Sequence, residues 1–355
     1  MSLTPDQLVT QVKGETVLLQ ELDLSGMDLS GIDLAGGVFS DVVFNNVNFS
    51  GADLRECKFL NCRFDQTNLS GADLRNSEWI EAIGSGMVFT DAVIRGANFI
   101  EPDMPHALFQ HSDLCDSSWI EARLTGADFT GSKMEAVSFI EPVLQGGIFD
   151  KAWMHRCSLI EADLSGTSFN ETVLETILFN ESQCAGLNFS LANTENASLQ
   201  FQASNLTGAD FSGCHLKMCG FMGCTLHRVD FSEANLNQAL LANSELVGVK
   251  GNKAILEQAV LDSAQLTGCE FRNIRAKESI FSNTKIDGCF FNGADFTYAD
   301  FSHSGIFQSD FSKTSLFRTN FHCMDDGMVL WAGSNKSEAL GTDPKRKKAE
   351  SFEVK

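Results

Sequence analysis

The sequence predicts an all-β solenoid whose coils have a square cross-section, and two regularities lead to this expectation. With few exceptions, a large apolar residue recurs at every fifth position from Leu24 to Leu199 and again from Leu206 to Phe321. Five times in the first half of the chain, at intervals of 20 residues, an apolar residue is followed by Ile-Glu and then by Ala or Pro. A fixed period of this kind indicates stacked repeats whose equivalent residues line up in columns.

A period of five matches neither the helix at 3.6 residues nor the strand at 2, so neither element is continuous. We expect each group of five to form one side of a coil and four sides to form a 20-residue turn. A small residue two positions before each large one points inward with it, and the other three face water or form the corner. Pairs such as Ser50-Gly51 suit these corners, because glycine adopts positive φ without steric penalty.

The chain resembles the pentapeptide repeat family, whose motif is Ala-Asp/Asn-Leu-x-x, over residues 22–321. The fragments that carry the resemblance include Ala52-Asp53-Leu54-Arg55, Ala72-Asp73-Leu74-Arg75, Ala162-Asp163-Leu164-Ser165 and Ala294-Asp295-Phe296-Thr297. The resemblance implies a right-handed quadrilateral parallel β-helix, and counting the groups of five gives about 15 coils.

Residues 1–21 are expected to form an N-terminal helical cap, because Thr4 and Gln7 make a capping box and Pro5 suits the first helical position. The β-helix is expected over 22–321 as one continuous domain. Leu199 and Leu206 are seven positions apart, so we expect a bulge or corner loop at 200–205, with a domain boundary as the alternative. This N-terminal helix would cover the exposed first coil.

The C-terminal region is expected to differ from the repeats. A C-terminal cap is predicted at 322–333, where the segment Met328–Trp331 would cover the last coil. A disordered basic tail is predicted at 334–355, because Lys345, Arg346, Lys347, Lys348 and Lys355 give it a local positive charge.

The composition limits the partners and the compartment. A net charge of −21 argues against direct binding to nucleic acid or to anionic membranes. No apolar run approaches the length of a membrane-spanning helix, so we expect no membrane insertion. Eleven cysteines in a chain without a recognisable signal peptide favour a reducing compartment, which we take to be the bacterial cytoplasm.

No enzyme, cofactor or metal site is expected, because no catalytic constellation or ligand spacing is present. Cys115 and Cys323 are predicted to face outward, and so are all seven histidines, no two of which are 20 residues apart. The cysteines predicted on the small inward position are Cys57, Cys62, Cys157, Cys214, Cys219, Cys224, Cys269 and Cys289.

Two outward columns are the candidate partner-binding surface. One contains Ile80, Ile100, Ile120, Ile140 and Ile160. The other contains Glu81, Glu101, Glu121, Glu141, Glu161 and Glu181. These columns are interpreted either as a ladder that stiffens the coil or as a contact surface for a protein. A third column, Arg55, Arg75 and Arg95, is expected to be a solubilising or docking stripe.

The predicted function is a non-enzymatic protein-binding scaffold whose partner is basic or apolar-faced, or is a second copy of the chain in a homodimer. The opening residues Leu3–Leu8 and Leu22–Gly26 look like those of family members associated with bacterial type VI secretion, which implies an adaptor or chaperone-like role. The alternative is an acidic DNA mimic that binds gyrase or a related topoisomerase, as some proteins of the family do.

Overall fold

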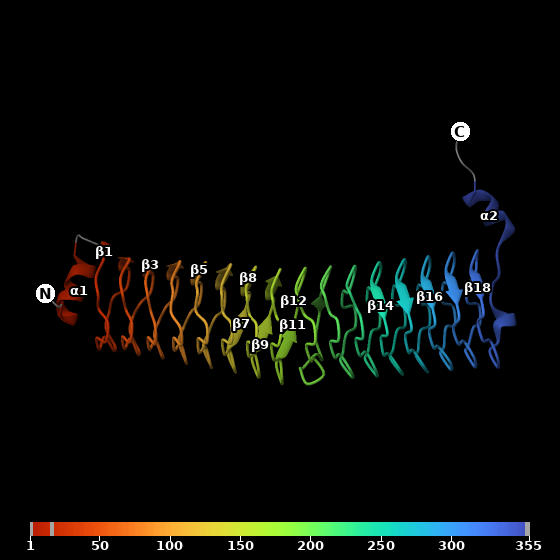
Figure 1. The fold of residues 1–355 in the computed structure, drawn as a ribbon, viewed down its shortest axis with the longest axis horizontal. Helices are drawn as coiled ribbons and strands as arrows, with labels where there is room; N and C mark the ends of the chain where they lie inside the picture. Colours follow the sequence, from red (N-terminus) through yellow and green to blue (C-terminus); the bar gives the residue numbers. More distant parts are fainter. Residues whose placement is uncertain (1–2, 15–17, 352–355) are drawn as a thin grey trace. The chain divides into compact units, whose positions relative to one another are not determined.

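The computed structural model describes residues 3–14 and 18–351. The chain divides into two compact units. Unit 1 comprises Met1–Gln183 with Leu191–Asn193, and unit 2 comprises Cys184–Ser190 with Thr194–Lys355. Both are built from coils of parallel β-helix, about 16 turns in all (Figure 1), which confirms the fold class that the five-residue period predicted.

Short strands mark one side of most coils. In unit 1 the elements are α1 (Pro5–Lys13), β1 (Leu18–Gln20), β2 (Val38–Ser40), β3 (Lys58–Leu60), β4 (Glu78–Ile80), β5 (Asn98–Ile100), β6 (Ser118–Ile120), β7 (Lys133–Glu135), β8 (Ser138–Ile140), β9 (Trp153–His155), β10 (Ser158–Ile160), β11 (Val173–Glu175) and β12 (Ile177–Leu178). In unit 2 they are β13 (Leu199–Gln200), β14 (Glu245–Val247), β15 (Gln265–Thr267), β16 (Lys285–Asp287), β17 (Gly305–Phe307), β18 (Asp325–Gly327), the 3-10 helix η1 (Lys336–Glu338) and α2 (Pro344–Glu350).

The strands pair in parallel with a register of 20 residues. In unit 1, β1, β2, β3, β4, β5, β6, β8, β10 and β12 are neighbours in this order, and β7, β9 and β11 form a second sheet. In unit 2, β14 to β18 are neighbours in chain order. Phe39 lies opposite Phe59, and Phe59 opposite Trp79, so each column holds one residue per coil.

The interior is filled by the predicted small and large residues. Ala52, Leu54, Cys57 and Phe59, for example, are all buried. Large aromatic residues stack on their equivalents in the next coil, since in-register strands lie about 4.8 Å apart. The rings of Phe99 and Trp119 are nearly parallel, with centroids 3.8 Å apart. Such stacks add to the free energy gained from apolar burial.

The two buried tryptophans of the strand side require a polar partner for their indole N–H. Trp79 Nε1 donates to Ser77 Oγ at 2.9 Å, and Trp119 Nε1 donates to Ser117 Oγ at 3.0 Å. In each case the serine occupies the small inward position two residues before the tryptophan. The serine in the small position therefore supplies the hydrogen-bond acceptor that the tryptophan in the large position requires.

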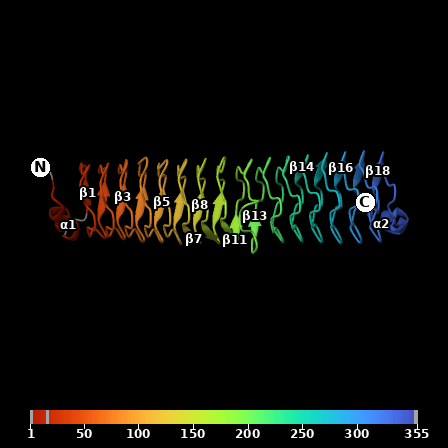
Figure 2. The same ribbon diagram turned by 90° about the horizontal axis from the view of Figure 1, so that it is seen from below.

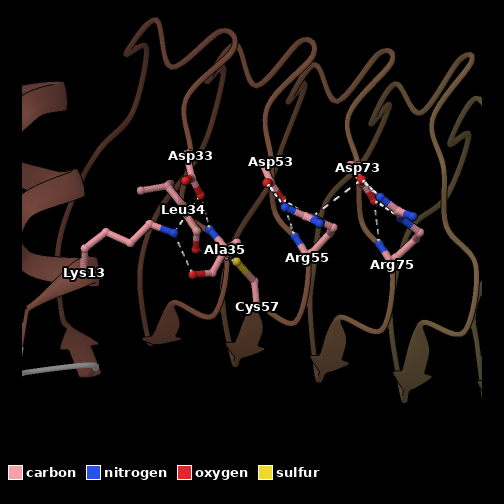
Figure 3. A network of polar contacts seen from close by, with 9 residues as sticks. All are labelled: Lys13, Asp33, Leu34, Ala35, Asp53, Arg55, Cys57, Asp73 and Arg75. Atoms are coloured by element: carbon pink, nitrogen blue, oxygen red, sulfur yellow. Dashed lines mark hydrogen bonds and ion pairs between the residues drawn. The ribbon is translucent and has the colours of Figure 1, made fainter.

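The N-terminal helix begins and docks as its sequence predicts. Thr4 and Gln7 form the capping box, and Leu8 and Val12 are buried. Lys13 Nζ donates to Asp33 Oδ1 at 2.7 Å, which ties the end of α1 to the first coil (Figure 3). The predicted cap at 1–21 includes residues 1–2 and 15–17, which lie outside the described part of the chain.

The extra residues of the register shift lie at a different place from the predicted one. Bridges elsewhere join residues 20 positions apart. Asn188 instead bridges Asp210, 22 positions on, whereas Gln200 bridges Gly220 at the normal distance. The two additional residues therefore precede Gln200, and the prediction of a bulge at 200–205 is wrong.

The physical reason is the position of Leu199. Sequence spacing made it the last large residue of the first register. In the structure it occupies the small inward position two residues before Phe201, and both side chains are fully buried. The wider corner is formed by residues 195–198, and the new register begins at Phe201.

The C-terminal tail is more ordered than predicted. Residues 334–355 were expected to be disordered, but η1 and α2 lie within them. Asp343 caps α2 by accepting hydrogen bonds from the backbone N–H groups of Lys345 and Arg346, and Pro344 occupies the first turn. Figures 1 and 2 both show α2 at the same end of unit 2 as β18. Residues 352–355 lie outside the described residues.

The last coil is closed differently from the prediction for 322–333. Met328 is 78% exposed and Leu330 is 61% exposed, so neither covers the core. Trp331 does cover it, because its ring packs on Phe311 with centroids 5.0 Å apart. Met328 and Leu330 point outward because the five-residue register continues through this coil.

Candidate functional site

The isoleucine column is formed by the final residues of five strands. The strands β4, β5, β6, β8 and β10 pair in register, so Ile80, Ile100, Ile120, Ile140 and Ile160 lie one above the other. Ile140 is 37% exposed and the other four are half-buried. Each isoleucine side chain is therefore only partly exposed. This exposure is smaller than expected for the water-facing position that the sequence predicted.

The apolar column is one coil longer than the sequence analysis proposed. Leu60 ends β3 and pairs with Ile80. It was missed because Asn61 follows it, so the Ile-Glu pair is absent in this coil. Alignment by the 20-residue period alone would have found it. We call the isoleucine and glutamate columns together, from residue 80 to residue 181, the Ile-Glu face.

The glutamates of the Ile-Glu face form the corner that follows each strand. All six, at positions 81, 101, 121, 141, 161 and 181, are exposed and have positive φ angles between 50° and 57°. This left-handed conformation is unfavourable for a side chain that carries Cβ, by about 1–2 kcal/mol per residue. Glutamate is thus a costly residue for this corner.

The neighbouring corner uses the residue that such a turn favours. Five positions after each glutamate, the same conformation is held by glycine in five of six cases, at Gly86, Gly126, Gly146, Gly166 and Gly186. The two corners have the same backbone shape, yet glycine holds one of them in five of the six coils and glutamate holds the other in all six. Backbone geometry therefore does not account for the carboxylates.

The carboxylates of the Ile-Glu face make no ion pair within residues 3–14 and 18–351. Adjacent unit charges about 5 Å apart repel by roughly 0.8 kcal/mol even in water, by Coulomb's law. Glu101, Glu121 and Glu141 also line a shallow groove of about 250 Å³ together with Asp103 and Arg123. The face thus combines an apolar column with a concentrated negative charge.

The arginine column does not form a comparable surface. Arg55 and Arg75 donate to Asp53 and Asp73, at 2.5 Å in each case (Figure 3). Arg95 pairs with Asp113 and Asp116. The hydrogen bond from Arg55 lowers the pKa of Asp53. Because these charges are already neutralised within the column, they offer little to a partner.

Ten of the eleven cysteines are buried, and the prediction for Cys115 is wrong. The eight cysteines predicted to point inward do so, as does Cys184. Cys115 was predicted to face outward but is fully buried, because its corner is covered by the next coil, where Lys133 O lies 3.9 Å from Sγ. Burial raises the pKa of Cys115 to about 11, so its thiol is unreactive at neutral pH. Cys323 is half-buried.

One histidine is also placed differently from the prediction. His322 was expected to face outward but is 1% exposed, and its ring lies beside that of His303. These two residues are 19 positions apart, at adjacent corner positions of neighbouring coils, so the 20-residue period does not relate them. The Glu350 side chain of α2 and the backbone N–H of Asp343 both contact the His322 ring, and sequence spacing gave no indication of these contacts.

Family comparison agrees with the repeat geometry. The description "Pentapeptide repeats (8 copies)" matches residues 23–61, 67–101, 106–139, 204–243, 219–250 and 281–304. A second description, "Pentapeptide repeat region", matches residues 132–211. Together they cover more than half of the chain.

The chain belongs to the pentapeptide repeat family. It is therefore a repeat scaffold of that family, with side chains presented in columns. None of the helices in the described parts of the chain has both the length and the apolar character to cross a membrane.

Two solved pentapeptide repeat proteins illustrate the similarity. QnrB1, a plasmid-mediated fluoroquinolone resistance protein, is 21% identical, with 54% of this chain and 90% of that chain covered and a TM-score of 0.27. HetL from the cyanobacterium Nostoc, involved in heterocyst differentiation regulation, is 16% identical over 97% of this chain and 98% of that chain, with a TM-score of 0.22. The comparison with curated proteins found no match.

Proposed function

We propose that this protein is a non-enzymatic scaffold that binds a protein partner through the Ile-Glu face. The observation that carries the proposal is the run of six glutamates in a corner whose backbone favours glycine. Each glutamate adds conformational strain and repels its neighbours, and none is neutralised within the described chain. A cationic partner would offset the repulsion.

The partner that fits this face has two properties. It presents lysine or arginine side chains at intervals close to the coil spacing of about 4.8 Å. It also offers an apolar surface to the half-buried isoleucines alongside, which would complete their burial. An apolar centre beside charged contacts is the usual composition of a specific protein interface.

The test replaces Ile100, Ile120 and Ile140 by serine and measures recovery of partners from the native cell by pull-down and mass spectrometry. Loss of a basic protein that the wild-type chain recovers is the expected result. The matched control replaces Val88, Leu108 and Ile148 by serine, because these half-buried apolar residues lie half a turn away. Equal recovery by wild type and the isoleucine variant would refute the proposal.

The same experiment addresses the finer proposal of an adaptor role in bacterial type VI secretion. That proposal rests on the resemblance of the opening residues Leu3–Leu8 and Leu22–Gly26. Secretion-system components among the recovered proteins would support it. Recovery of an unrelated basic protein would support the scaffold function and would contradict the role in secretion.

The second candidate, a DNA mimic acting on gyrase, is favoured by the net charge of −21. The column spacing argues against it. One carboxylate per about 4.8 Å is sparser than the phosphates of one DNA strand, which are about 3.4 Å apart along the axis. A supercoiling assay decides the question: we expect no effect on gyrase over a wide concentration range, and inhibition or protection would favour the mimic.

A further inference from the structure

Three side chains with metal-binding atoms converge near the C-terminal end of unit 2. His303 and His322 come from neighbouring coils, and Glu350 comes from α2. His322 Nε2 lies 3.0 Å from Glu350 Oε2, and His303 Nε2 lies 3.3 Å from the same oxygen. One donor atom from each of the three residues lies within 4.8 Å of the other two.

These distances match the edges of a metal coordination shell. Zinc in proteins is tetrahedral, with Zn–N and Zn–O bonds of about 2.0–2.1 Å, so neighbouring ligand atoms are separated by about 3.3 Å. Both nitrogen–oxygen distances to Glu350 are close to this value. Cys323 Sγ lies 3.3 Å from His322 Nε2, which places a thiol beside the same corner.

We propose that His303, His322 and Glu350 bind a divalent transition metal, with zinc as the best match. Two imidazoles and one carboxylate suit zinc, whereas magnesium and calcium prefer oxygen ligands alone. The fourth position is open to water or to the thiolate of Cys323. The His303 and Glu350 side chains are about one-third exposed, so a metal reaches them from solvent, whereas the His322 ring is buried and held in place.

Metal binding requires a change at His322. The backbone N–H of Asp343 donates to His322 Nδ1 at 3.0 Å, so the neutral ring carries its proton on Nε2, which faces Glu350. Coordination through Nε2 moves that proton to Nδ1 and displaces the Asp343 N–H. Coordination by several protein ligands is much stronger than the hydrogen bonds it replaces. The start of α2 therefore adjusts when the metal binds.

The site would fasten α2 to the coil. A helix of seven residues is too short to be stable alone, so α2 depends on its contacts with the β-helix. Glu350, at its last position, reaches His322 and His303, and Asp343 precedes its first residue. A metal held by Glu350 would thus fix a basic segment, Lys345–Lys348, against the C-terminal coils.

Calorimetry with Zn²⁺ on the full chain, in a non-thiol reductant, tests the proposal. We expect one ion per chain and at least tenfold weaker binding in His303→Ala and in Glu350→Gln, both of which alter exposed side chains. The control variants His215→Ala and Glu171→Gln change an exposed histidine and an exposed glutamate elsewhere and should bind as wild type does. Equal affinity in all five proteins, or no binding by wild type, would overturn the proposal.

Two further readouts separate a specific site from binding at scattered side chains. Co²⁺ should give the visible absorption of a tetrahedral ion in wild type and not in His303→Ala, and a thiolate charge-transfer band would identify Cys323 as the fourth ligand. Zn²⁺ should slow trypsin cleavage within Lys345–Lys348 in wild type but not in Glu350→Gln. Cleavage that zinc leaves unchanged in wild type would exclude Glu350 as a ligand.

Discussion

The ammonium group of Lys336 lies 2.8 Å from the carboxylate of Asp326 at the C-terminal end of the β-helix. Both residues occupy positions that are apolar in the preceding coil: Asp326 pairs in register with the buried Ile306, and Lys336 follows the buried Leu316 by 20 residues. Lys336 Nζ also lies 3.9 Å from the centre of the Trp331 ring. The last coil thus closes the apolar core with an ion pair and a cation–π contact.

Replacing both charged residues by leucine should make the chain associate with itself. In Asp326→Leu/Lys336→Leu the end of the core would be apolar and would lie beside unpaired strand edges, which favour pairing with another chain. We expect the dissociation constant for self-association, measured by analytical ultracentrifugation, to fall at least tenfold. The exchanged pair Asp326→Lys/Lys336→Asp should sediment as wild type does. A double-leucine variant that sediments as wild type does would show that the ion pair does not protect this end.

A second prediction concerns the buried tryptophans. Ser117→Ala should destabilise the protein by about 1–3 kcal/mol, because it leaves the Trp119 N–H buried without an acceptor. Adding Trp119→Phe should recover most of this loss, since Ala97 and Phe99 already form this combination in the neighbouring coil. Urea unfolding of both single variants and the double variant measures the coupling. Additive effects would mean that the hydrogen bond contributes nothing.

The repeat explains why so much of the fold could be predicted. A column position recurs every 20 residues, so a single residue that departs from the pattern, such as Gly84 at a large position, does not obscure the register. The same logic identified the isoleucine and glutamate columns, whose stacking follows directly from the parallel pairing of Ile80 with Ile100. Periodicity is a strong predictor wherever each coil contacts only its neighbours.

The errors occur where contacts do not follow the period. Leu199 is large yet fills a small position, because the corner before it contains two extra residues. His322 became buried through α2, a contact between segments that share no repeat. Cys115 occupies a corner position that the repeat pattern predicts to face solvent, but the backbone carbonyl of Lys133 in the next coil covers its thiol. Local spacing carries no information about such contacts, which depend on side-chain packing between non-equivalent positions.

Acid should weaken the β-helix through carboxylates such as Asp53. The hydrogen bond from Arg55 holds the pKa of Asp53 below its ordinary value of 3.8. A lowered folded-state pKa gives stability that is present above the unfolded value and is lost as pH falls through the folded one. The free energy of unfolding should therefore be constant with respect to this group above about pH 5 and decline below about pH 4.

The Asp53→Asn variant isolates this contribution. Asparagine keeps the shape and the acceptor oxygen but does not titrate, so the decline in unfolding free energy below about pH 4 should be shallower than in wild type. Asp65→Asn is a suitable control, because Asp65 is exposed and has no ion pair in the described residues. Identical pH profiles for wild type and Asp53→Asn would show that the Arg55 contact has no effect on acid stability.

The glutamate corner yields a prediction in which stability and binding change in opposite directions. In Glu101→Gly/Glu121→Gly/Glu141→Gly, glycine removes the strain of the left-handed conformation and ends the repulsion between carboxylates. We expect the free energy of unfolding in urea to rise by about 0.5–1 kcal/mol per site.

The reverse change, Gly146→Glu, should lower the free energy of unfolding by a similar amount, because a Cβ at Gly146 meets no atom within 4 Å and only the backbone strain is added. The triple variant should nonetheless lose the basic partner recovered by wild type. A triple variant that is less stable than wild type would mean that the glutamates stabilise the fold. A triple variant that is more stable and binds the partner equally well would show that the carboxylates do not contribute to partner binding.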